Sequence, residues 1–278
     1  MSPAAQAVLR EWSPPVAVDA LLLFSLLLYL RGWILLQRSS SRRLRWYHLA
    51  AFLGGLSALW ISVGSPLSAF DEASLTVHMI QHILLMLIAP PLLLLGAPAL
   101  PFLHGMPQWL LRKVVAPVFR TTAVQSGWKF LSHPVICWFI SAAALIMWHV
   151  PAAFEHALRS DALHDIEHVS FLTTSLLFWW PVVQPYPSEA RWARWTIPMY
   201  LFLGMFPSGA LGAFLTFCDR VLYPSYLTQP PLFGLTPIED QIVAGSLMWV
   251  LGIFIFTVPA VLIMLKVLSP RTMQATSR

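Results

Sequence analysis

The chain has very few charged residues. They make up 10% of its 278 residues, against about 25% in an average soluble domain. So few charges cannot cover the surface of a water-soluble fold of this length, which excludes a soluble globular enzyme, a disordered chain and a coiled coil. The formal net charge of +5 does not indicate a nucleic-acid partner, because what matters is where the positive charges lie relative to apolar segments.

Cysteine is almost absent. Cys137 and Cys218 are far apart and show no CxxC spacing. This excludes a disulfide framework and argues against a thiolate metal cluster. The first apolar run is preceded by no basic segment and no small-residue cleavage site, so we expect no removable signal peptide.

Apolar and aromatic residues are abundant. Apolar residues make up 58% of the chain, with 13 Trp, 6 Tyr and 23 Pro, which is typical of helical membrane proteins. A membrane span needs about 20 mostly apolar residues. The sequence therefore predicts an all-α, polytopic membrane protein whose residues 1–278 form one integral membrane domain, a bundle of seven transmembrane helices. The predicted spans are 17–36, 46–64, 76–96, 133–151, 164–183, 195–217 and 242–266. Segment 105–131 mixes aromatic and basic residues and is expected to lie in the membrane interface.

The basic residues predict the orientation. With the N-terminus outside, fourteen of the seventeen Lys and Arg residues fall on the inner side: Arg31, Arg38, Arg42, Arg43, Arg45, Arg112, Lys113, Arg120, Lys129, Arg191, Arg194, Lys266, Arg271 and Arg278. The positive-inside rule then places the C-terminus in the cytoplasm. The acids show the opposite bias, since of twelve only Glu189 falls inside. A cation-attracting outer face and ordinary polar outer loops both explain this bias.

Six of the nine histidines fall at the predicted outer ends of spans or in the loops between them: His78, His82, His149, His156, His164 and His168. His78 and His82, like His164 and His168, are spaced i,i+4, which places two imidazoles on one helix face roughly 6 Å apart along the axis. Ionisable residues in spans usually face the bundle interior. We therefore predict a shared metal site formed by these histidines, with His156 as its marginal member because it lies in a loop.

Imidazole ligands suit copper, zinc, iron and nickel. Met79 would add a thioether that favours copper, although at helical spacing it is also an ordinary packing residue. Asp71, Asp165, Glu167 and Asp240 are candidate partners that orient the metal ligands. Glu167 adjoins His168 and is expected to point off the face of the second histidine pair. Asp240 is also a candidate N-cap of the last span.

Several motifs occur together at these positions. They are His78-Met-Ile-Gln-His82 with Ala89-Pro-Pro-Leu-Leu and Leu95-Gly-Ala-Pro98, Trp148-His-Val-Pro151, Glu167-His168 with Phe178-Trp-Trp-Pro181, and Asp240-Gln241 before Met248-Trp249. In this combination the chain resembles, from about residue 20 to 265, the CtaG (caa-type cytochrome c oxidase assembly factor) family.

This resemblance implies a seven-span protein of the bacterial inner membrane that assists the assembly of haem-copper oxidases. It implies a non-enzymatic role in which copper is held or delivered at the periplasmic face. The expected partners are an oxidase subunit or a periplasmic copper chaperone, together with the lipid bilayer. His78, His82, His149, His164 and His168 match family motif positions, and His156 matches less securely.

Other functions remain open from the residues alone. A membrane cytochrome would clamp haem between histidines on facing helices, but these histidines occur in one-turn pairs at a common level. A membrane hydrolase would use histidine-bound zinc to activate water, with Asp or Glu nearby. A copper transporter would need metal-binding groups across the bilayer, and spans three to five lack ionisable residues below the outer level.

Overall fold

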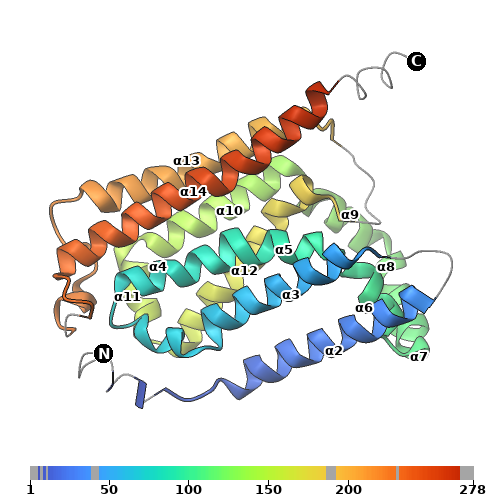
Figure 1. Ribbon diagram of the computed structural model, residues 1–278, viewed down its shortest axis with the longest axis horizontal. Coiled ribbons are helices and arrows are strands. Elements are labelled where there is room, and N and C mark those ends of the chain that lie inside the picture. The colour runs from blue at the N-terminus through green and yellow to red at the C-terminus, as the bar shows by residue number, and fades with distance from the viewer. Residues whose placement is uncertain are drawn as a thin grey trace.

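The computed structural model describes residues 6, 9–10, 12–38, 44–185, 192–229 and 232–269, and within these ranges every regular element is helical (Figure 1). The prediction of an all-α fold is therefore confirmed. Some charged residues that entered the orientation argument lie outside the described residues: Glu11, Arg42, Arg43, Glu189, Arg191, Arg271 and Arg278.

The elements follow in chain order. The first part contains α2 (Val16–Arg38), α3 (Trp46–Val63), the 3-10 helix η1 (Pro66–Phe70), α4 (Leu75–Ile83), the π-helical turn η2 (Leu84–Ile88) and α5 (Ala89–Leu95). The middle contains α6 (Ala99–Gly105), α7 (Gln108–Leu110), the π-helical turn η3 (Leu111–Val115), α8 (Ala116–Arg120) and α9 (Thr122–Leu131). The last part contains α10 (Pro134–His149), α11 (Pro151–Leu158), α12 (Asp161–Val183), α13 (Thr196–Phe217), the 3-10 helix η4 (Pro224–Leu227) and α14 (Pro237–Leu268).

Five helical segments are long and apolar enough to cross a membrane: Val16–Arg38, Trp46–Phe70, Leu75–Leu95, Thr196–Phe217 and Pro237–Leu268. A sixth is obtained if α9 and α10, which meet at a bend of 70°, are taken as one span. Predicted span 133–151 coincides with α10, which has only 16 residues. Predicted span 164–183 lies in α12, which is not among the candidates, and polar residues in its first half make it less apolar. The structure therefore supports five or six of the seven predicted spans.

The centre of the bundle is the continuous helical rod formed by α4, η2 and α5 (Figure 1). This rod packs against α3, α12 and α14, and 67% of the residues in its most apolar 18-residue stretch are buried. The π-helical turn ends two residues before Pro90 and Pro91, which have no backbone N–H to donate and would clash with the preceding turn of a regular helix. The rod places residues of α4 in the protein interior from their first turn.

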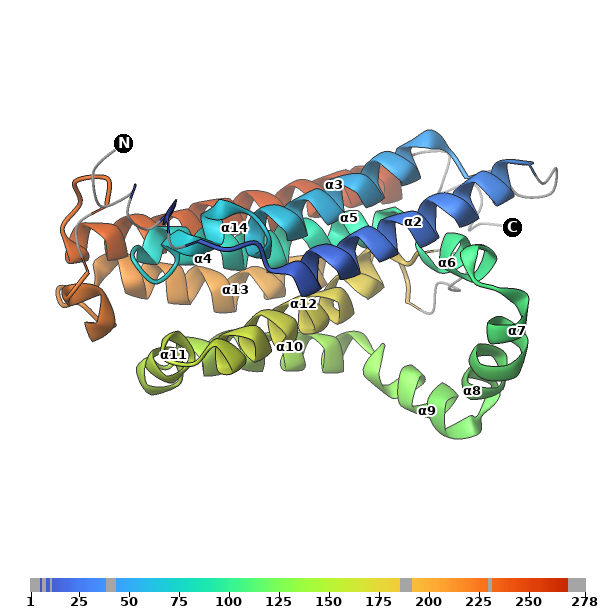
Figure 2. The same cartoon turned by 90° about the horizontal axis from the view of Figure 1, so that it is seen from below.

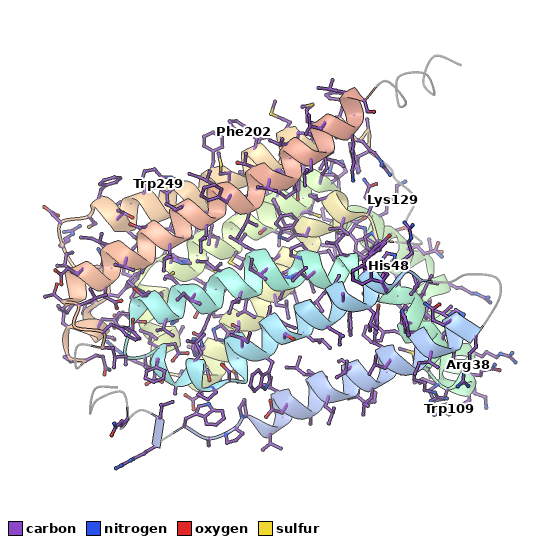
Figure 3. The ribbon with its side chains drawn as sticks, viewed as in Figure 1. Arg38, His48, Trp109, Lys129, Phe202 and Trp249 are labelled. Atoms are coloured by element: carbon purple, nitrogen blue, oxygen red, sulfur yellow. The ribbon has the colours of Figure 1, made fainter. Side chains whose placement is uncertain are left out.

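Helices α13 and α14 pack against each other along much of their length (Figure 1). Gly212 and Gly245 face each other at their contact, where a Cβ on Gly212 would lie 2.8 Å from the carbonyl oxygen of Gly245. Small residues allow membrane helices to approach this closely. Phe202 and Trp249 lie on the outer side of the same pair (Figure 3), as expected for a surface in contact with lipid.

The two ends of the bundle differ. Trp60, near the end of α3, donates a hydrogen bond to Asp19 at the start of α2, so these two helices run antiparallel. Arg38, His48, Trp109 and Lys129 gather toward the end that carries α6 to α9 (Figure 3). The first turns of α4 and α14 lie toward the opposite end (Figure 1).

Segment 105–131 forms α7, η3, α8 and α9, and Figure 2 shows these helices projecting away from the main bundle. The side chains of Trp109 and Phe119 are 62% and 66% exposed, and the basic residues of this segment are exposed as well. Exposed aromatic and basic residues on short helices are the composition expected at a membrane interface. The interfacial location itself stays a prediction.

Candidate metal centre

Five of the six histidines of the predicted site come together from three helices. Within α4 the rings of His78 and His82 lie 4.3 Å apart between centroids, and within α12 those of His164 and His168 lie 4.2 Å apart. His78 stacks on His164 at 5.3 Å, and His82 lies 5.9 Å from His168. His149, from the last turn of α10, lies 5.6 Å from His82. These five residues are called the histidine cluster below.

A buried carboxylate anchors the helix that carries the first histidine pair. Asp240 of α14 accepts hydrogen bonds from the backbone N–H groups of Leu75 and Thr76 at 2.7 and 3.2 Å, and from the hydroxyl of Ser74 at 3.0 Å. These N–H groups belong to the first turn of α4, which has no partner for them within the helix. Asp240 therefore holds the start of α4 in place and lies one turn from His78.

The suggestion that Asp240 caps its own helix is wrong. The N-terminus of α14 carries a capping box instead, in which the Thr236 hydroxyl accepts from the backbone N–H of Glu239 and the Glu239 side chain accepts from the backbone N–H of Thr236. Asp240 is thereby free to cap α4, which follows a loop far away in the sequence.

Replacing Asp240 by alanine should destabilise the protein. The substitution removes the acceptor of three hydrogen bonds at a buried helix start, so we expect the free energy of unfolding to fall by about 2 kcal/mol or more. The midpoint of thermal unfolding in detergent measures the effect. Asp219→Ala is the matched control, because Asp219 is exposed. Equal midpoints for the two variants would contradict the anchoring role of Asp240.

Glu167 is completely buried and lies in the cluster. Its Oε1 is 3.5 Å from Nε2 of His82. The expectation that Glu167 points off the face of the second histidine pair is therefore wrong. Residues 164, 167, 168 and 171 share one side of a helix, because both i,i+3 and i,i+4 neighbours are close. Phe171, on the same side, is in edge contact with the ring of His82 at 4.6 Å.

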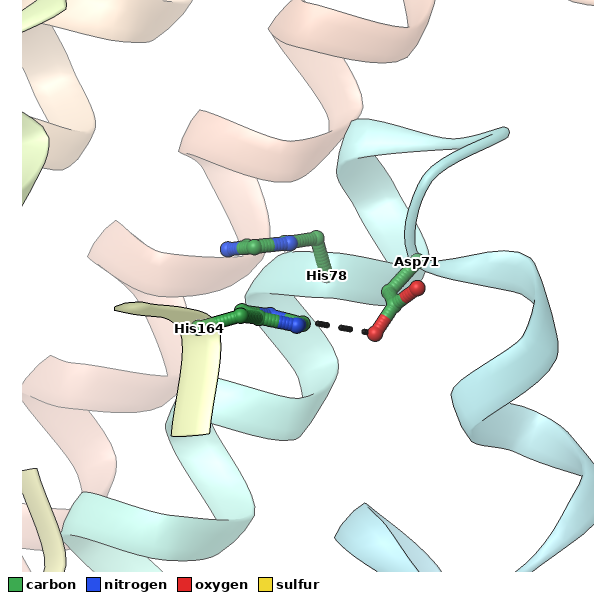
Figure 4. Close-up of side chains that lie close together, drawn as sticks. All are labelled: Asp71, His78 and His164. Atoms are coloured by element: carbon green, nitrogen blue, oxygen red, sulfur yellow. Dashed lines mark ion pairs between the residues drawn. The ribbon is translucent and has the colours of Figure 1, made fainter. Parts of the chain in front are cut away.

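Asp71 approaches the cluster from the loop after η1. Its Oδ2 lies 3.9 Å from Nε2 of His164 (Figure 4). Burial raises the pKa of Asp71 to about 7, and a hydrogen bond from the Gln81 side chain partly offsets this rise. A carboxylate that is costly to ionise in isolation is stabilised by a nearby cation.

Most of the polar atoms in the cluster have no hydrogen-bond partner. Among the described residues, thirteen buried side-chain nitrogen and oxygen atoms lack one, and nine of these belong to the cluster and Glu167. They are both ring nitrogens of His78 and of His82, Nε2 of His149, His164 and His168, and both carboxylate oxygens of Glu167. Buried polar atoms are nearly always paired in proteins, so this concentration makes the cluster a candidate ligand-binding site.

The atoms are spaced so that they could hold a metal ion. Two sets of three donors have their ligand atoms within 4.8 Å of one another: Asp71, His78 and His164 (Figure 4), and His78, His82 and Glu167. Ligands of one ion lie up to about 4.2 Å apart when each metal–ligand bond is about 2.1 Å. Small side-chain movements would bring either set around one ion.

Three other residues of the predicted site lie elsewhere. His156 is exposed on α11, its Nδ1 is 2.6 Å from the carbonyl oxygen of Ala152, and it is absent from the ring contacts described above. Asp165 is exposed beside His164. Met79 is buried in the hydrophobic core, next to but not among the donor sets. The structure therefore brings together His78, His82, His149, His164 and His168 with Asp71 and Glu167.

Aromatic residues of α11 and of the segment around η4, which no sequence motif marks, cover the cluster. The Tyr226 hydroxyl donates to the carbonyl oxygen of Asp71 at 2.9 Å, and the Tyr223 hydroxyl donates to that of His149 at 3.1 Å. Phe154 stacks on Tyr223 at 3.9 Å and contacts the ring of His78 at 4.8 Å. No motif marks these aromatic residues, because their role depends on contacts between segments distant in the sequence.

These features define the class to which the chain belongs: a helical membrane protein with a buried cluster of histidine and carboxylate side chains that could hold a metal ion, at one end of its bundle. The family can also be stated. The family model for the cytochrome c oxidase caa3 assembly factor (Caa3_CtaG) matches residues 27–269, and the chain belongs to this family. The resemblance seen in the sequence is thereby confirmed.

Relatives in mycobacteria carry no functional description. An uncharacterized protein of Mycobacterium bovis and one of Mycobacterium tuberculosis are each 27% identical over 226 residues, which is 72% of this chain and 31% of theirs. An uncharacterized protein of Mycobacterium leprae is 24% identical over 235 residues, which is 80% of this chain and 34% of that protein. The chain thus spans about a third of the length of these curated relatives. No solved structure matches the chain.

Proposed function

We propose that the protein binds copper in the histidine cluster and supplies it to a caa3-type cytochrome c oxidase during assembly. The observation that carries this proposal is the set of nine buried donor atoms without a hydrogen-bond partner. Such atoms are costly in a protein interior unless a ligand satisfies them. Neutral imidazole nitrogens and carboxylates satisfy a metal ion, and membership of an oxidase assembly family points to a metal that an oxidase needs.

The ring geometry argues against haem, whereas copper and zinc are separated by measurement. The rings of the cluster are separated by 4.2 to 5.9 Å between centroids, which leaves no room for a macrocycle among them. Zinc would bind the same donors, and a zinc hydrolase remains the alternative that the metal measurement below separates from copper binding. A hydrolase would also need a pocket for its substrate, whereas an assembly factor that gives its metal away would not.

The metal preference can be measured directly. The full chain, purified in detergent and stripped of metal, is titrated with Cu(I) under anaerobic conditions or with Zn(II), each against a chromophoric chelator. We expect at least one tightly bound Cu(I) per chain and weaker binding of zinc. Binding of zinc alone, together with hydrolytic activity, would replace the proposal by the hydrolase. Absence of any metal binding would refute both functions.

We further propose that the chain crosses the bacterial inner membrane seven times, with α10 and α12 as full spans and the N-terminus outside. The basic residues Arg38 and Lys129 lie toward one end of the bundle (Figure 3), as the positive-inside rule requires of a cytoplasmic end. The first turns of α4 and α14 lie toward the other end (Figure 1). This orientation opens the histidine cluster toward the periplasm, where a copper chaperone or an oxidase subunit would meet it.

Reporter fusions test the orientation. Alkaline phosphatase, which folds only outside the cytoplasm, should be active when fused after Ser160 and inactive when fused after Ser269. Green fluorescent protein at the same two positions should give the reverse pattern. Active phosphatase after Ser269 would contradict the orientation, and with it the periplasmic access to the cluster.

A further inference from the structure

We infer that the cluster contains two adjacent metal positions that share His78, and this inference rests on the proposed metal binding. The outer position consists of Asp71, His78 and His164, and the inner one of His78, His82 and Glu167. His78 lies one helical turn nearer the start of α4 than His82, a shift of roughly 6 Å along the axis. The two donor sets therefore lie at successive depths below the outer surface.

The state of the His78 ring supports a shared ligand. A histidine that binds one metal ion normally donates its second ring nitrogen to a carbonyl or carboxylate. His149 follows this pattern, because its Nδ1 lies 2.8 Å from the carbonyl oxygen of Leu145 while its Nε2 is unpartnered. His78 and His82 are both buried with both ring nitrogens unpartnered among the described residues, but only His78 belongs to both donor sets. If the ring loses its N–H proton, the resulting imidazolate would offer one nitrogen to each donor set.

The two donor sets and their shared ring carry few charges. Each donor set contains a single carboxylate, Asp71 in the outer set and Glu167 in the inner one. Both carboxylates are buried, and a buried charge is tolerated when an opposite charge compensates it. With the N–H proton of the shared ring lost, the two carboxylates and the imidazolate carry three negative charges, so two Cu(I) ions would leave a net charge of −1 and two divalent ions a net charge of +1. Either pair of ions would therefore leave only one residual charge in the interior.

Two positions at different depths suit a protein that receives and releases copper at one surface. An ion at the outer position contacts Asp71, which belongs to a surface loop and whose backbone is held by Tyr226. The inner position is enclosed by α4, α10 and α12 and is farther from that loop. Copper would therefore enter and leave through the outer position, while the inner position retains its ion longer.

Copper stoichiometry tests the inference. The full chain in detergent is loaded with excess Cu(I) without oxygen, freed of unbound copper and analysed for copper per chain. We expect two equivalents in the wild-type protein, one in Asp71→Asn and one in Glu167→Gln. The two variants should differ in kinetics, because Asp71→Asn keeps the slowly exchanging ion and Glu167→Gln keeps the rapidly exchanging one.

Controls separate this inference from the proposed function. His156→Ala should retain two equivalents, since His156 lies outside both donor sets. Each variant is first compared with the wild-type protein in elution volume and thermal unfolding, and His78→Gln replaces any variant that does not fold, with an expected loss of both ions. One equivalent in the wild-type protein, weakened by both carboxylate substitutions, would overturn the shared site and leave the proposed function intact. No bound copper would overturn both.

Discussion

Replacing both His78 and His82 by alanine is expected to lower the affinity for Cu(I) by about a hundredfold or more. These two residues supply four of the nine buried unpartnered donor atoms. Loss of a single residue that merely orients a ligand typically lowers metal affinity 10- to 100-fold, so loss of two direct ligands should have at least that effect. Competition with a chromophoric Cu(I) chelator measures the affinity.

The chain provides a matched control for this double variant. His104 and His156 are exposed, and the Nδ1 atom of each lies close to the carbonyl oxygen four residues earlier in its own helix. Replacing both by alanine removes the same chemical groups and should leave the affinity unchanged. A second pair, His78→Phe with His82→Phe, keeps most of the buried ring volume, so that loss of copper in this pair cannot be attributed to a cavity. Unchanged affinity in both cluster variants would show that the histidines are not the ligands.

The histidine cluster could be predicted from the sequence because its geometry is mostly local. An i,i+4 spacing fixes the relative position of two side chains on a helix, whatever the rest of the chain does. Two such pairs and the single His149, at helix ends of similar depth as counted from the ends of the spans, imply that the histidines meet. Their meeting then required only that ionisable groups in spans face the interior, as they do here.

The carboxylates were harder to place, because their positions depend on contacts between distant segments. Asp71 lies in a loop whose path follows no periodic pattern, and Asp240 caps a helix that begins 165 positions earlier. Adjacency to His168 favours a Glu167 side chain that points away from the pair, but the i,i+3 relation of Glu167 to His164 places it on the cluster side of α12. Tyr223 and Tyr226 were not singled out, since loop tyrosines acquire a role only through the segments on which they pack.

The number of spans shows a similar limit. Counting apolar runs assumes that every membrane span has a similarly high mean hydropathy. α12 departs from this rule because its first half carries the polar residues of the cluster, which are shielded by neighbouring helices instead of facing lipid. α10 departs from it by its length of 16 residues, because it ends at His149 and the chain turns at Val150 into α11. Of the three helices that carry the histidine cluster, α10 and α12 are thus the two that do not pass as candidate spans on their own, whereas α4 belongs to one.

In cells, replacing His78 by alanine is expected to reduce caa3-type oxidase activity about tenfold or more, to the level of a strain that lacks the protein. His78 is present in both donor sets, so its loss weakens both of them. The oxidase should accumulate with its haem but with too little copper, as measured by metal analysis of the purified enzyme. Copper added to the medium should restore part of the activity.

Met79, which follows His78 in the sequence, provides the control for this cellular experiment. Met79 is buried in the hydrophobic core beside His78, and Met79→Leu conserves its volume while removing its thioether. If imidazoles hold the copper, this variant should assemble oxidase normally, provided that immunoblots show equal amounts of both variants in the membrane. Loss of oxidase copper in Met79→Leu with normal activity in His78→Ala would assign copper binding to the thioether. Full oxidase activity in both variants would remove copper delivery from the functions of this protein.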